Sequence, residues 1–227
     1  MAAAAGAPTP LQRMEAYTSL LETLERGRAA AEARPPPGGA LQTILAAQEG
    51  GARTPPYAAA LGEIRAGRKK THWVWYVWPT LKSLRPGTHK PQYLLPDFAT
   101  AVQYLATPPL AGRLREISQA ACEQLRGGVA PETLMGSATD AGKLHESWTL
   151  FALAAAAAVE PGQLALFCGW LEALRAALSG GGGSPSGGRP PELFDARTVA
   201  AVRGDGTTPP QLRRQLSAPQ RLCALGH

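Results

Sequence analysis

The chain has 227 residues, a hydrophobic fraction of 44% and a formal net charge of +6 at pH 7. This length predicts one domain with tails, or at most two small domains, and the hydrophobic fraction is ordinary for a globular core. The longest apolar run, residues 148–159, is shorter than the ~20 residues of a transmembrane helix, so we expect no membrane contact. The first residues resemble no secretory signal, which favours a cytoplasmic protein and leaves organelle targeting open.

Glycine and proline, with 25 and 21 residues, cluster and so divide the chain. The predicted parts are an N-terminal extension over 1–39 (an amphipathic helix over 11–34 and a Pro/Gly linker over 35–39), a helical domain over 40–204 with a Gly/Ser/Pro-rich insertion at 179–191, and a flexible basic tail over 205–227.

No segment is a convincing strand, so we predict an all-α fold: a compact single helical domain of about seven helices with flexible tails. The stretch from Thr71 to Trp78 is ambiguous, because its Val and Trp content favours a strand. Since no partner strand is evident, we predict a short helix there that ends before Pro79. The other expected helix ends are marked by Gly50, Pro56, Gly67, Asp97, Thr107, Gly127, Asp140, Pro161 and Asp195.

The three cysteines, Cys122, Cys168 and Cys223, lie far apart and form no metal-ligand spacing. Cys122 and Cys168 fall in apolar helical patterns, so we expect buried thiols, which fits a reducing compartment. The sequence also lacks a phosphate loop, a dinucleotide fingerprint and a hydrolase triad order. We therefore predict no metal and no cofactor, and the catalytic residues, if any, are unknown.

The densest stretch runs from Gly67 to Leu81, where three consecutive cations precede a histidine and four large aromatics. Residues 61–90 hold seven Lys and Arg against Glu63 alone, so this window accounts for the whole net charge of +6. A local positive field attracts phosphates, carboxylates or nucleic acid. Burying an unpaired cation costs free energy, so we expect the cations at the rim of the space that the indole rings fill.

This arrangement predicts a basic, aromatic-lined site for a small anionic ligand. Arg68 and Lys69 are expected to hold phosphate, and Trp73 or Trp75 to stack on a flat group. His72 is a candidate proton donor or acceptor. The alternative is that the tryptophans serve only the core and His72 only the backbone.

A second constellation lies at 140–149, where Lys143 and Ser147 share a helix face. Lys143 is a candidate second contact for the anion, and Ser147 a further ligand-binding candidate. A Lys–Ser pair also suggests nucleophile activation, but no glycine-flanked elbow supports it.

The segment from Glu63 to Pro79 reads EIRAGRKKTHWVWYVWP. Together with blocks at 41–48, 108–116 and 140–151, it resembles the uncharacterised family catalogued as domain of unknown function 1810, sometimes labelled calpastatin-like, over about residues 40–204. The resemblance implies a compact, mostly helical, soluble domain and no established activity. Thr80, Glu146 and Trp148 depart from the family pattern, which has Gln, Ser and Met there.

The leading hypothesis is therefore a soluble domain that binds a small anionic, nucleotide-like ligand. The alternatives are nucleic-acid binding, which requires a broad basic face, and a protein-interaction module built on the 1–34 helix and the tail. Whether the protein is an enzyme, and its oligomeric state, stay open.

Overall fold

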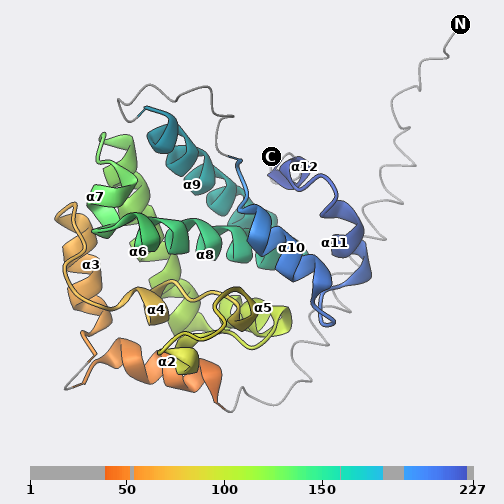
Figure 1. The fold of residues 1–227 in the computed structure, drawn as a ribbon, viewed down its shortest axis with the longest axis horizontal. Coiled ribbons are helices and arrows are strands. Elements are labelled where there is room, and N and C mark those ends of the chain that lie inside the picture. Colours follow the sequence, from red (N-terminus) through yellow and green to blue (C-terminus); the bar gives the residue numbers. More distant parts are fainter. Residues whose placement is uncertain (1–38, 52–53, 159, 181–191, 224–227) are drawn as a thin grey trace, which may run out of the picture. The chain divides into compact units, whose positions relative to one another are not determined.

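The chain is described here by a computed structural model that covers residues 39–51, 54–158, 160–180 and 192–223 (Figure 1). These residues contain eleven α-helices, seven of them eight residues or longer, and no strand, so the predicted all-α fold is confirmed. The helices are α2 (Ala40–Glu49), α3 (Tyr57–Arg65), α4 (Val74–Val77), α5 (Phe98–Leu105), α6 (Pro108–Arg126), α7 (Pro131–Met135), α8 (Ala138–Ala157), α9 (Pro161–Gly180), α10 (Ala196–Gly204), α11 (Pro210–Gln215) and α12 (Gln220–Cys223), with 3₁₀ turns η1 (Lys82–Leu84) and η2 (Pro91–Tyr93). None of these helices is long and apolar enough to cross a bilayer.

Helix α8 forms the centre of the domain, with α5, α7, α9 and α10 packed around it (Figure 1). Thirteen of its twenty residues are buried, as expected for a helix enclosed on most sides. Its Trp148 contacts Trp78 and Trp170 at ring-centroid distances of 6.4 and 5.9 Å. The Ser118 hydroxyl on α6 accepts hydrogen bonds from the indole N–H groups of Trp78 and Trp148, at 3.0 and 2.9 Å. These bonds satisfy two donors that would otherwise be buried without a partner.

Most predicted helix ends are confirmed. The short helix α4 ends directly before Trp78 and Pro79, and Asp97 and Asp195 cap α5 and α10 through backbone N–H groups three residues later. Gly67 closes α3 with a positive φ of 76°, a conformation that favours glycine.

One predicted cap is wrong. The side chain of Ser137, not of Asp140, caps α8 by accepting from the Asp140 backbone N–H at 3.1 Å. The Asp140 carboxylate is thereby available for contacts with other side chains.

The C-terminal segment differs from the prediction. Instead of a flexible tail, its described part forms α11 and α12 and buries Leu212, Leu216 and Leu222.

Cys223 on α12 forms a disulfide with Cys168 on α9, so the expectation that Cys168 is a free thiol is wrong. Cys122 is free and buried, as predicted. The extension over 1–38 and most of the 179–191 insertion lie outside the described residues.

Candidate functional site

The turn between α3 and α4 is organised by the carboxylate of Glu63. It accepts hydrogen bonds from the backbone N–H groups of Lys70 and Thr71 at 2.7 and 3.0 Å, from the Thr71 hydroxyl at 2.6 Å and from the Trp73 indole at 2.7 Å. Burial alone would raise the pKa of Glu63, but these donors stabilise the anion and lower the pKa below its usual value. Glu63 is the one acid among residues 61–90, which we call the basic window, and it stabilises the turn that carries the cations.

Lys69 is drawn inward by backbone contacts. Its N–H donates to the Leu134 carbonyl at 2.7 Å, which joins the turn to α7. Gly136 follows with a φ of 74°, and a Cβ there would lie 3.1 Å from the Lys69 carbonyl oxygen. A larger residue at this position would therefore be strained and would crowd the turn.

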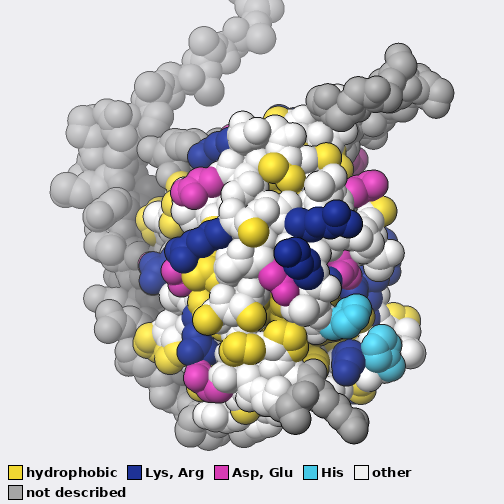
Figure 2. All heavy atoms as spheres, turned by 90° about the vertical axis from the view of Figure 1, so that its left-hand side faces the viewer, with side chains coloured by type: hydrophobic (Ala, Val, Ile, Leu, Met, Phe, Trp, Pro, Cys, Tyr) yellow, Lys and Arg dark blue, Asp and Glu magenta, His cyan; other side chains and the backbone are white. Residues whose placement is uncertain are grey.

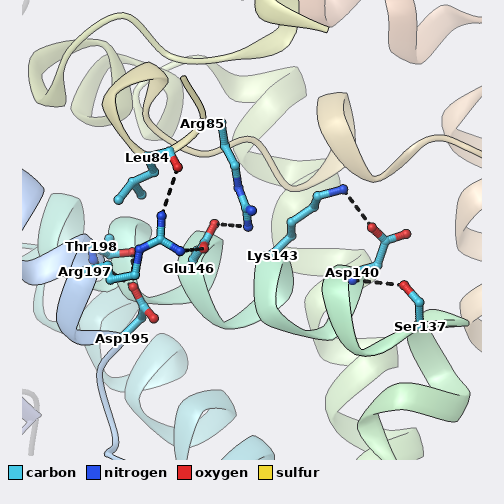
Figure 3. Close-up of polar contacts among 9 residues, drawn as sticks. All are labelled: Leu84, Arg85, Ser137, Asp140, Lys143, Glu146, Asp195, Arg197 and Thr198. Carbon is cyan, nitrogen blue, oxygen red and sulfur yellow. Dashed lines mark hydrogen bonds and ion pairs between the residues drawn. The ribbon is translucent and has the colours of Figure 1, made fainter. Parts of the chain in front are cut away.

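Lys69, Asp140 and Lys143 form a nearly buried cluster, which we call the Asp140 triad. The Lys69 ammonium lies 2.7 Å from Asp140 Oδ2, and the Lys143 ammonium 2.8 Å from Oδ1, a pair drawn in Figure 3. The three side chains are 7%, 15% and 8% exposed, in that order. Burial opposes ionisation of Asp140, but its hydrogen bonds and charge interactions with the two lysines prevail and lower its pKa. Two ammonium groups thus share one carboxylate, which leaves the triad with an excess positive charge.

Trp75 connects the triad to an aromatic surface. The Lys143 ammonium lies 3.7 Å from the centroid of its ring, a cation–π contact. His89 meets the same indole edge-on, with ring centroids 6.0 Å apart. Trp75 is the one of the five tryptophans, all of them described, that is not buried. Trp73, in contrast, is fully buried beneath Lys69, 5.7 Å from that ammonium.

A model of the family described as "Protein of unknown function (DUF1810)" matches residues 40–169, more than half of the chain. The chain belongs to this family. Among solved structures it is similar to the conserved hypothetical protein Rv1873 from Mycobacterium tuberculosis, with 29% identity and a TM-score of 0.53 over 70% of this chain and 94% of that one. No functionally curated protein matches it.

In this DUF1810 protein, the predicted ligand-binding residues fall into three groups. Lys69, Trp75 and Lys143 are brought together by the contacts above. Arg68 and His72 belong to the same turn of the chain as Lys69 and are exposed, and neither side chain forms an ion pair with a described residue. Trp73 and Ser147 are fully buried, contrary to the prediction that they face a ligand. The Ser147 hydroxyl, one turn beyond Lys143 on α8, has no hydrogen-bond partner among the described residues.

Sequence reasoning missed the acid that joins the two lysines. The spacing of Asp140 and Lys143 is that of an i,i+3 ion pair and was the available signal. It was overlooked because Asp140 also suits a helix cap. The described residues contain no cluster of three or more His, Cys, Asp or Glu that could hold a metal ion.

The departure from the family pattern at Glu146 has a structural role. Its carboxylate, 5% exposed, lies 2.6 Å from an Arg85 nitrogen and 3.9 Å from one of Arg197. Burial raises the pKa of Glu146, although Arg85 acts against that shift. Figure 3 shows Arg85 reaching from the loop after η1 toward α8, and Arg197 also donates to the Leu84 carbonyl at 3.1 Å. Glu146 thus joins this loop to α8 and α10.

The charge of the basic window is partly compensated in the fold. Three of its seven cations pair with carboxylates outside the window, in the pairs Arg65–Glu116, Lys69–Asp140 and Arg85–Glu146. On the face near α3 and α7, Lys and Arg side chains are interspersed with acidic ones (Figure 2). This part of the surface is therefore not a continuous basic face.

Proposed function

We propose that this protein binds a small anionic, nucleotide-like ligand at the surface formed by Arg68, Trp75 and the Asp140 triad. The observation that carries the proposal is the position of Trp75. It is the one indole that is not buried, and it lies against Lys143, one of two nearly buried lysines that share a single carboxylate. An aromatic face beside excess positive charge suits a ligand that has both a flat group and an anionic group.

The residues would have distinct roles. The exposed Arg68, which has no ion pair among the described residues, supplies a guanidinium for the anionic group, and Lys69 and Lys143 add positive charge nearby. Trp75 offers its exposed surface to the flat group. Trp73 is buried and supports the turn from below. A small ligand is favoured over nucleic acid because acidic side chains are interspersed among the Lys and Arg side chains on the face in Figure 2. A cytoplasmic location stays a prediction.

Isothermal titration calorimetry with adenosine 5′-monophosphate tests the proposal. We expect binding that weakens by about tenfold in both Arg68→Ala and Trp75→Leu, because each removes an interaction of about 1.4 kcal/mol or more. Arg115→Ala is the matched control, since this exposed arginine of α6 forms no ion pair with a described residue. Absence of heat with the wild type, or equal affinity in all variants, would refute the proposal. Steeply salt-dependent binding of a single-stranded oligonucleotide, without mononucleotide binding, would favour the nucleic-acid alternative.

A further inference from the structure

The basic loop between α4 and α5 is a closed structure of its own. Leu81 and Leu95 form an isolated parallel bridge at its two ends. The Lys82 N–H donates to the Leu95 carbonyl at 2.8 Å, and the Leu95 N–H donates to the Thr80 carbonyl at 2.9 Å. A surface loop of this length with paired ends is an Ω-loop, a form that often carries function.

This loop lines an open cavity of about 400 Å³, within the size range of small-molecule pockets. None of the residues predicted to bind ligand from the sequence lines it. The lining contains two cations, two hydroxyl groups and no carboxylate, together with an apolar wall of proline and leucine. The lining residues are Lys82, Ser83, Arg85, Pro86, Gly87, Thr88, Pro91, Leu94 and Pro96.

Arg85 is held at this cavity with unused hydrogen-bonding capacity. Its side chain is 20% exposed and is fixed from behind by the ion pair with Glu146. Its buried Nε has no hydrogen-bond partner among the described residues. This N–H has no contact with solvent, so the exposed part of the Arg85 side chain, and not its Nε, is what the cavity offers to a ligand.

The charges around the cavity also favour the binding of an anion. Arg85 and Arg197 pair with Glu146, and Lys82 lines the cavity without an ion pair to a described residue. Asp195 lies close enough to Glu146 to raise its pKa, so three cations stand against two carboxylates and the local excess is one positive charge. A phosphate ester is anionic at pH 7 and accepts several hydrogen bonds, which matches the sign of this charge and the donors of the lining.

We propose that the 82–95 loop is a second binding site, which takes the phosphate group of a small phosphate ester. Arg85 and Lys82 bind the phosphate, the Ser83 and Thr88 hydroxyls donate to it, and Leu94 with the neighbouring prolines contacts the carbon skeleton. This site uses none of the residues of the proposed nucleotide-like site and does not depend on it.

The test is an NMR titration of the full chain with inorganic phosphate and with phenyl phosphate. We expect the backbone amides of Gly87 and Thr88 to shift with both probes, and phenyl phosphate to bind more tightly because of the apolar wall. Lys82→Ala should weaken binding by about tenfold, the loss typical of a charge-assisted hydrogen bond. Lys90→Ala is the matched control, since Lys90 belongs to the same loop but does not line the cavity.

Arg85→Lys keeps the charge near Glu146 but loses the guanidinium geometry, so it should weaken binding without unfolding the protein. The proposal is overturned if the loop amides do not shift, or if Lys82→Ala behaves like Lys90→Ala. Shifts confined to the Trp75 indole would overturn this site while supporting the proposed function. Equal affinity for the two probes would overturn the assignment of an ester.

Discussion

Replacing Asp140 with asparagine removes the charge that Lys69 and Lys143 share while keeping the side chain's size. The two lysine side chains are only 7% and 8% exposed, so water screens them poorly. Removing one partner of a buried ion pair costs about 3–5 kcal/mol, because the remaining charge is left uncompensated. Asp140 is 15% exposed and Trp75 partly offsets the Lys143 charge, so we expect a loss of about 3 kcal/mol in the free energy of unfolding.

Urea denaturation at pH 7, followed by circular dichroism, measures this loss. Glu132→Gln is a matched control, because Glu132 is exposed on α7 and forms no ion pair with a described residue; it should change stability by no more than about 0.5 kcal/mol. A loss below about 1 kcal/mol in Asp140→Asn would refute the view that the triad is a buried, interdependent cluster.

The same variant has a predicted pH dependence. The pKa of Asp140 is lower in the folded protein than in the unfolded chain. The stability that its carboxylate contributes is therefore present above the unfolded pKa and is lost as the pH falls through the folded pKa. The difference between the wild type and Asp140→Asn should shrink on acidification. A constant difference down to the acid-unfolding region would contradict the assigned shift.

Three further variants probe the support of the site. Ser118→Ala leaves two buried indole N–H groups unpaired and should cost about 2–4 kcal/mol, read from the urea midpoint; a neutral effect would contradict the shared hydrogen bonds. Glu63→Gln should lower the free energy of unfolding by about 1–2 kcal/mol at pH 7. Folding lowers the pKa of Glu63, so this loss should fade as the pH falls through the folded pKa. Cys168→Ser should cost about 4 kcal/mol, since the disulfide with Cys223 closes a loop of 55 residues, and thiol titration of the unfolded wild type should find one free thiol. Three free thiols would contradict the disulfide.

Helices and their ends were predictable because their signals are local. The stop at Gly67, the proline at the start of α6 and the caps at Asp97 and Asp195 depend on a few neighbouring residues. The short helix before Pro79 followed from the lack of any partner strand.

The site was predictable only in part because its decisive contacts are distant in sequence. Lys69 and Asp140 are 71 positions apart, and Arg85 and Glu146 are 61 apart. A charge count over a window treats such cations as free, which is why it placed Lys69 at a rim when the structure places it inside. The disulfide was missed for a related reason, because α12 has little apolar periodicity of its own and owes its position to packing on α9.

The most direct test of the proposed function is an NMR titration of the tryptophan indole N–H resonances with adenosine 5′-monophosphate. The account predicts that the Trp75 resonance shifts in a saturable way, while those of the four buried tryptophans move little. Lys143→Met, which removes the ammonium from the Trp75 ring, should abolish or strongly weaken the shift. No shift of Trp75 at millimolar nucleotide, or an equal shift in Lys143→Met, would contradict the assignment of a ligand site to this surface.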